Sequence, residues 1–294
     1  HATASADEAR TTAGPPIAPR AGIRILVAED NPVNRKVVAR ILARAAFEAR
    51  LVESGEDALD ALAEGDFDVV LLDINMPGLS GLDVVKLYRM AALDQPRIPI
   101  IALSADATVE TRDAALAAGV DVYLTKPVEP NRLVAEINAL VGPAAAPASE
   151  LPLPEEAVEP GDAIAVEDGG DELPVLNRDA LAALNAYSNP EEDFVLTILR
   201  DFIVNTEHLL GEAGNAAYAG DAERFRGAIH AMRGTAGNVG ADALRQFCQE
   251  LQGMTGERLR NNREAYIARL EHECARLRRD IGRFQVERQG TAPA

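Results

Sequence analysis

The sequence predicts two domains: an α/β domain built on a doubly wound five-stranded parallel sheet, followed by an all-α helical bundle. Between residues 23 and 141, apolar runs of strand length alternate with helical stretches, which is typical of βαβ units. From residue 177 onward only helical periodicity appears. A segment rich in proline and acidic residues separates the two regions, and a length of 294 residues suits two domains.

The first domain is predicted to occupy residues 21–142. Its strands are expected at residues 23–28, 49–53, 68–72, 98–103 and 121–124, and its helices at residues 33–46, 55–64, 81–92, 109–118 and 130–141. The first, third and fourth of these strands are almost purely apolar, as expected where helices cover both faces of a parallel sheet.

Three segments are predicted to be disordered. Residues 1–20 form a leader without any period, and residues 289–294 form a short tail. Residues 143–173 hold many Asp and Glu, several prolines and no Lys or Arg. Such a segment cannot bury enough apolar surface to fold, and its like charges favour an extended linker.

The second domain, residues 174–288, is predicted to be a bundle of four or five amphipathic helices. Helical periodicity is clearest at residues 193–210, 222–233, 242–253 and 262–284. The expected core positions of the first stretch are Phe194, Val195, Ile198, Leu199, Phe202 and Leu209. On the second stretch Phe225, Ile229 and Met232 suit the core.

The composition excludes several classes of function. A formal net charge of -18 opposes nucleic-acid binding, which depends on basic residues. No apolar run is long enough for a membrane span, so no membrane contact by this fragment is expected. Cys248 and Cys274 are too few for a disulfide framework and lack metal spacing, which favours a reducing, cytoplasmic compartment. The chain begins with His1 instead of Met, so we expect it to be a piece of a longer protein.

Polar side chains follow four of the predicted strands. Glu29 and Asp30 end the first, Asp73 the third, Ser104 the fourth and Lys126 the fifth. The carboxyl ends of the strands of such a sheet meet at one edge. Three carboxylates there are unfavourable without a cation, and their oxygens suit Mg²⁺. Together the five side chains predict a phosphoryl-transfer site in which Asp73 attacks phosphorus. Each residue alone could be a helix cap or a turn residue, but capping does not explain the whole set.

A histidine in the helical region has unusual neighbours. Steps of four, three and four residues separate Arg226, His230, Arg233 and Gly237, so these four residues share a helix face. Glycine costs roughly 1 kcal/mol in a helix relative to alanine. Gly234 and Gly237 therefore indicate either close approach of another protein to His230 or, alternatively, eased helix packing or the helix end near Asn238.

The motifs of the first domain resemble those of response-regulator receiver domains, which have a CheY-like, flavodoxin-like fold. They are VAEDNPVNRKV, LLDINMPGLSGLD, IIALSA and DVYLTKP, within residues 23–142. The resemblance implies that Asp73 is phosphorylated and that Glu29, Asp30, Asp73 and the backbone carbonyl of Asn75 hold Mg²⁺.

The same resemblance assigns further roles. Ser104 and Tyr123 are the expected switch pair, the ring turning inward when Ser104 meets the phosphate. Lys126 contacts the phosphoryl oxygens, and the Lys126–Pro127 peptide bond is expected to be cis, which is uncommon even before proline.

The motif HAMRGTAGNVGA resembles the signature of histidine phosphotransfer (HPt) domains, and residues 176–286 resemble that bundle throughout. The resemblance implies that His230 carries phosphate on a ring nitrogen. Arg233 takes the place usually held by Lys and should meet the phosphate with a fork of donors. Gln252 falls where some members place a Gln that steadies the imidazole.

The order receiver, acidic linker and HPt resembles the carboxy-terminal part of hybrid sensor kinases, in particular sensors of diffusible-signal-factor quorum sensing. That resemblance implies phosphorylation of Asp73 by an upstream histidine kinase domain and relay from His230 to a downstream response regulator. It also implies a signal synthase as a partner of the receiver and anchoring of the whole protein in the inner membrane. The sequence holds no ATP-binding module with an Asn-rich box and a Gly-rich lid, so the kinase must be upstream or separate.

Two other classes of function share part of this pattern. Phosphatases of the haloacid-dehalogenase type also combine an Asp nucleophile with Mg²⁺, but they need a second acid two places after the nucleophile, where this chain has Asn75. A pure interaction module with vestigial phosphorylation is opposed by the complete acidic pair, Lys126 and His230.

Overall fold

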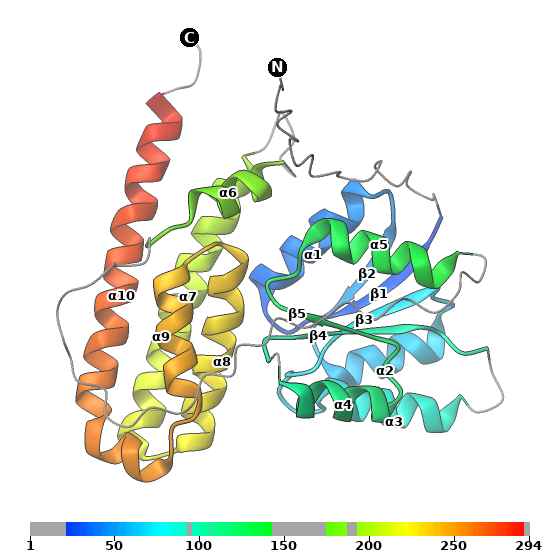
Figure 1. The fold of residues 1–294 in the computed structure, drawn as a ribbon, viewed down its shortest axis with the longest axis horizontal. Coiled ribbons are helices and arrows are strands. Elements are labelled where there is room, and N and C mark those ends of the chain that lie inside the picture. The colour runs from blue at the N-terminus through cyan, green and yellow to red at the C-terminus, as the bar shows by residue number, and fades with distance from the viewer. Residues whose placement is uncertain (1–21, 93–95, 107, 143–174, 187–192, 291–294) are drawn as a thin grey trace, which may run out of the picture.

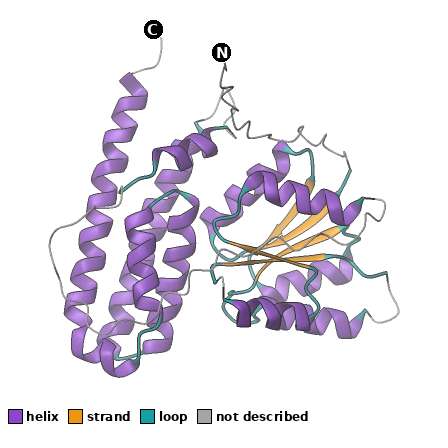
Figure 2. Cartoon of the chain, viewed as in Figure 1, coloured by secondary structure: helices purple, strands orange, loops and turns teal. Residues whose placement is uncertain are grey.

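The computed structural model describes residues 22–92, 96–106, 108–142, 175–186 and 193–290. These residues form an α/β domain and a helical domain that lie side by side (Figure 1). Figure 2 shows that strands occur in the first domain and that the described part of the second is helical. The predicted leader and the whole of the predicted linker lie outside the described residues.

The α/β domain is built on parallel strands in the order β2-β1-β3-β4-β5, five of them in the described part of the chain. The strands are β1 (Arg24–Ala28), β2 (Glu48–Val52), β3 (Val69–Asp73), β4 (Ile100–Ser104) and β5 (Val122–Thr125). Strands β3 and β4 are buried at every position, as expected for the centre of a sheet that is covered on both faces. The predicted doubly wound α/β fold is confirmed.

Helices cover both faces of this sheet. They are α1 (Pro32–Arg44), α2 (Gly55–Glu64), α3 (Gly81–Ala91), α4 (Val109–Ala118) and α5 (Pro130–Val141). Figure 1 shows α1 and α5 on one face and α2, α3 and α4 on the other. Each helix begins at a residue whose side-chain oxygen accepts a hydrogen bond from the first turn, and α1 and α5 also have proline at the start.

The second domain is a bundle of α6 (Arg178–Asn185), α7 (Phe194–Ala219), α8 (Ala222–Asn238), α9 (Asp242–Gln252) and α10 (Gly256–Gly290). The predicted core residues of α7 and α8 are buried. Helices α7, α8, α9 and α10 lie roughly alongside one another in Figure 1, so the predicted bundle is confirmed.

Several helix limits differ from the prediction. Helix α7 continues to Ala219 instead of residue 210, and α8 continues through Gly234 and Gly237 to Asn238. Helix α10 extends to Gly290, so the predicted tail at residues 289–294 begins inside a helix. The last part of that tail lies outside the described residues.

The two domains contact each other along α1. Lys36 of α1 pairs with Asp201 of α7, with 2.5 Å between Nζ and Oδ2. Arg40 lies over the ring of Phe194, 5.2 Å from its centre. The apolar core beneath α1 and α5 is continuous with the core of the bundle. This arrangement, with α7 and α8 against the α/β domain, is called the docked arrangement below.

The composition predicted neither a membrane span nor a disulfide framework. Among the described helices, none combines the length and the apolar character of a membrane span. Cys248 and Cys274 are both buried and unbridged.

Candidate functional site

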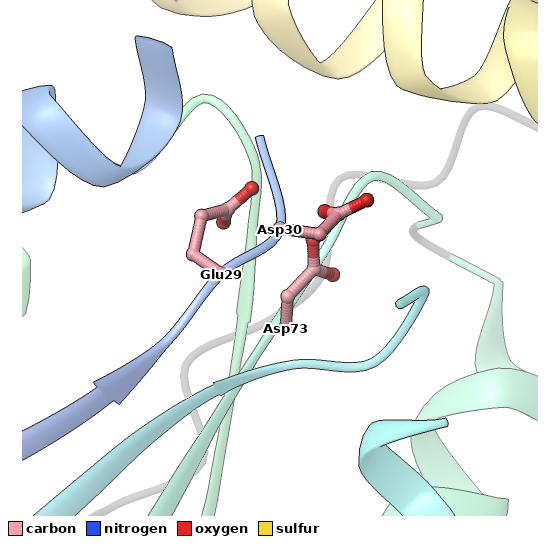
Figure 3. Close-up of side chains that lie close together, drawn as sticks. All are labelled: Glu29, Asp30 and Asp73. Carbon is pink, nitrogen blue, oxygen red and sulfur yellow. The ribbon is translucent and has the colours of Figure 1, made fainter. Parts of the chain in front are cut away.

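The acidic residues predicted to converge do so at the carboxyl edge of the sheet. Glu29 and Asp30 follow β1, and Asp73 ends the neighbouring strand β3. Figure 3 shows the three carboxylates gathered at these strand ends. One oxygen from each lies within 4.8 Å of one from each of the others. The three carboxylates come together because β1 and β3 are parallel neighbours, so both strands end at the same edge of the sheet.

Lys126 lies between two of these carboxylates. Its Nζ is 2.6 Å from Glu29 Oε2 and 2.6 Å from Asp73 Oδ2. The side chain is buried, and it is brought here from β5 by the turn that contains the Lys126–Pro127 bond. That bond is cis, as the receiver resemblance implies.

The charges of the site are only partly balanced. Burial raises the pKa of Glu29 to about 7, although Lys126 acts in the opposite direction. Burial and the nearby Asp73 also raise the pKa of Asp30. Burial acts to lower the pKa of Lys126, but the carboxylates of Asp73 and Glu29 outweigh it and raise that pKa above its ordinary value. One ammonium thus faces three carboxylates, and the remaining negative charge and oxygen ligands fit a hard divalent cation such as Mg²⁺.

Three other predicted receiver residues form hydrogen bonds with or within the loops that follow β3 and β4. The backbone N–H of Asn75 donates to Asp73 Oδ1 at 3.0 Å. Ser104 is fully buried, and its Oγ accepts from the N–H of Asp106 at 3.0 Å. The half-buried Tyr123 donates its hydroxyl to the carbonyl of Asp106 at 2.6 Å. Ser104 and Tyr123 therefore both contact the loop that follows β4.

His230 lies on α8, where it is half-buried. Its Nδ1 is 2.9 Å from Gln252 Nε2 on α9, so Gln252 lies where the HPt resemblance places it. Burial, followed by the neighbouring Arg233, lowers the pKa of His230 to about 4. The imidazole is therefore neutral at pH 7. The other described histidines, His208 and His272, are exposed.

The acidic cluster and His230 open into the same space. A cleft of about 630 Å³ between the domains is lined by Asp30, Asp73 and Lys126 from one side and by His230, Arg226 and Gly234 from the other. In Figure 3 the carboxylates lie beneath a helix of the second domain. The structure thus brings the predicted nucleophile of one domain and the predicted phosphate carrier of the other to one site.

Several residues near His230 contact the α/β domain. Arg233 donates from its guanidinium to the backbone carbonyl of Ala105, whereas Arg226 donates within the bundle to the carbonyl of Met254 at 3.0 Å. A Cβ atom at Gly237 would lie 3.3 Å from Pro127 Cδ. One at Gly234 would lie 3.9 Å from Asn34 Nδ2. The face of α8 that carries these two glycines therefore lies against the α/β domain.

Sequence reasoning missed Asn34 and Asn238, which are 2.8 Å apart across the interface. Asn34 is buried and also donates to Glu29. A polar residue in the first turn of an amphipathic helix normally indicates capping or exposure. The pattern of one chain segment therefore gives no sign of a partner more than two hundred residues away.

Two family models match the chain. Residues 25–138 match the response regulator receiver domain, and residues 197–280 match the Hpt domain. The chain is 34% identical over 233 residues to the sensory/regulatory protein RpfC of Xanthomonas campestris pv. campestris, covering 79% of this chain and 30% of RpfC. It is 29% identical over 273 residues to the sensor protein GacS of Pseudomonas syringae, covering 90% of this chain and 29% of GacS.

A solved structure is similar to the first domain. It is the receiver domain of the sensor histidine kinase PA1611 from Pseudomonas aeruginosa, 33% identical, covering 42% of this chain and all of that one, with a TM-score of 0.39. The chain spans about 30% of the length of RpfC and of GacS. Its first domain belongs to the response regulator receiver family and its second to the HPt family, and together they are a domain pair of two-component phosphorelay signalling.

Proposed function

We propose that the chain is the receiver and HPt portion of a hybrid sensor kinase, and that a phosphoryl group passes between Asp73 and His230. The observation that carries this proposal is the cleft between the domains, which both side chains line. Phosphoryl transfer is catalysed mainly by positioning and by neutralising charge, and the cleft offers both.

Asp73 is the proposed phosphoryl acceptor of the receiver. Glu29, Asp30 and Asp73, with the backbone carbonyl of Asn75, would hold Mg²⁺, which when bound neutralises charge on the phosphoryl oxygens. Lys126 already contacts Asp73 and would neutralise a further oxygen. After phosphorylation the hydroxyl of Ser104 turns to the phosphoryl group, and Tyr123 follows it inward.

His230 is the proposed acceptor on the HPt domain. Gln252 occupies Nδ1, which leaves Nε2 for the cleft. For Nε2 to have a free lone pair, the proton must stay on Nδ1 and Gln252 must present its amide oxygen to it. The nitrogen and oxygen of an amide differ little in shape, so this orientation fits the same contact.

The proposed transfer step replaces one bond to phosphorus with another. His230 Nε2 attacks phosphorus, and a new P–N bond forms while the P–O bond to Asp73 breaks. The electron pair of that bond returns to the carboxylate, where Lys126 stabilises it. The proton on Nδ1 stays in place. Arg226, which lines the cleft, and Arg233, next to His230 on α8, would stabilise the added negative charge.

The proposed partners follow from the family resemblance. An upstream histidine kinase domain phosphorylates Asp73, and a downstream response regulator receives the phosphoryl group from His230. The resemblance to diffusible-signal-factor sensors supports a signal synthase as an additional partner of the receiver, a quorum-sensing input and anchoring of the whole protein in the inner membrane.

The test is to label the full chain with acetyl phosphate and Mg²⁺. The unmodified chain should take both an acid-stable label on Asp73 and an acid-labile label on His230. Asp73→Asn should abolish both, and His230→Gln only the second. His208→Gln, at an exposed histidine of the same domain, serves as the matched control. Acid-labile label on the His230→Gln chain, or continuous release of inorganic phosphate without labelling, would overturn the proposal.

A further inference from the structure

Asn34 joins the acidic site of the receiver to the HPt domain. It lies in the first turn of α1 and is 3% exposed. Its Nδ2 donates to Glu29 Oε1 at 2.9 Å, and its Oδ1 accepts from Asn238 Nδ2 at 2.8 Å. One amide therefore contacts a carboxylate of the proposed Mg²⁺ site on one side and the last residue of α8 on the other.

The chemistry of Glu29 determines how this amide is turned. Glu29 accepts from Lys126 Nζ at one oxygen and from Asn34 Nδ2 at the other, so the nitrogen of Asn34 faces Glu29. Its oxygen must then face the HPt domain. A buried amide oxygen is stable only when a donor meets it. The HPt surface must therefore present a donor at this point, and Asn238 does so.

The side chain of Asn34 has no role in capping α1. The helix is capped by Asn31, whose Oδ1 accepts from the backbone N–H groups of Val33 and Asn34. On the facing helix Gly234 has no side chain, and its Cβ position is next to Asn34 Nδ2. Local structure thus leaves the amide oxygen of Asn34 to the domain contact.

We propose that Asn34 is a specificity-determining and positioning residue, through which the receiver accepts an HPt helix only if that helix presents a hydrogen-bond donor at the place of Asn238. This inference rests on the proposed transfer between Asp73 and His230. Because Asn238 is on the same helix as His230, its bond to Asn34 holds α8 over the acidic site. Partners with an acceptor or an acidic group at this place are rejected by the oxygen of Asn34.

The experiment follows single-turnover transfer to His230 in the full chain, as a rate constant per phosphorylated Asp73. Asn238→Ala removes the donor and should slow transfer roughly five-fold, the effect of one lost hydrogen bond. Asn238→Asp has nearly the same shape but sets an acceptor against an acceptor, so it should slow transfer more. Asn262→Asp adds the same charge at an exposed position of the HPt domain and should leave the rate constant unchanged.

A double-mutant cycle separates positioning from general structure. Asn34→Ala and Asn238→Ala should together slow transfer no more than the larger single effect, because both remove the same bond. Three results would overturn the inference. The two single effects could multiply in the double variant, Asn238→Asp could leave the rate constant unchanged, or Asn238→Ala could slow transfer more than Asn238→Asp does. Circular dichroism confirms that each variant is folded. Failure of the proposed function itself is distinct, because the unmodified chain would then show no acid-labile label.

Discussion

Lys126 is the residue whose contacts are most sensitive to change. Its ammonium is buried between Glu29 and Asp73. Removing one partner of a buried ion pair leaves an uncompensated charge and typically costs roughly 3–5 kcal/mol. A bound divalent cation would replace part of the lost positive charge.

Lys126→Met should therefore lower the free energy of unfolding by several kcal/mol in the presence of a chelator, and less with Mg²⁺ present. It should also slow labelling of Asp73. The measurement is urea unfolding followed by circular dichroism, since the chain contains no Trp. Lys86→Met is the matched control, because Lys86 pairs with Asp83 at the surface, where such a pair is worth roughly 0–1 kcal/mol. Equal losses for the two variants would contradict this account of Lys126.

His230 links protonation to domain docking. Its pKa in the docked arrangement is lowered to about 4 from an ordinary value of 6.5. The docked arrangement thus favours the neutral ring. The stability that this contributes is fully present above pH 6.5 and is lost as the pH falls from 6.5 towards 4.

We predict that NMR of the His230 ring in the full chain gives a titration midpoint well below 6.5, near 4. A variant that weakens docking, such as Asn238→Asp, should move the midpoint upward. A midpoint near 6.5 in the unmodified chain would show that His230 is not covered by the receiver in solution.

The site residues on strand ends were predictable, whereas the interface residues were not. Glu29, Asp73 and Lys126 stand immediately after or at the end of strands, and parallel topology brings such positions together. The Asn34–Asn238 bond depends on how two separate domains dock, and no periodicity of either segment carries that information.

At the scale of elements, α8 shows why some helix limits were wrong. The helical pattern predicted a helix over residues 222–233, but the helix continues through Gly234 and Gly237 to Asn238, near which a helix end was the alternative prediction. Gly237 faces Pro127 of the receiver, and its Cβ position is also 3.4 Å from Arg245 Cδ. The glycine is therefore explained by a tertiary contact that outweighs its low helix propensity.

Gly237→Ala tests this reading. Alanine should raise the stability of α8 itself by up to about 1 kcal/mol, but the added methyl group should press on Pro127 and weaken docking. We expect slower transfer from Asp73 to His230 with an unchanged or higher midpoint of thermal unfolding for the HPt domain. Gly211→Ala on α7, where a Cβ meets nothing within 4 Å, should change stability alone. Equal transfer rates in the two variants would refute the role of Gly237 in docking.

At the scale of the whole molecule, the docked arrangement makes the partners compete. The proposed upstream kinase would need access to Asp73 and the proposed downstream regulator to His230, and both side chains line the cleft between the domains. Under the proposed function, the domains would therefore have to separate before either partner could bind. Across the described interface, a continuous apolar core is joined by the Lys36–Asp201 ion pair, by Arg40 over the ring of Phe194 and by the Asn34–Asn238 bond.

The division into two domains and both fold classes followed from the sequence, because strand and helix periodicities differ. Their mutual placement did not, since it depends on contacts such as that of Lys36 with Asp201, between residues 165 positions apart.

The central claim is that Asp73 and His230 of one chain exchange a phosphoryl group. The most direct measurement is the rate of transfer from labelled Asp73 to His230 in the purified full chain, after removal of the phosphodonor, over a wide range of protein concentrations. Tethering gives an effective concentration on the order of millimolar, so the rate constant should not depend on protein concentration. A rate that rises in proportion to concentration, or label that never reaches His230, would contradict the claim.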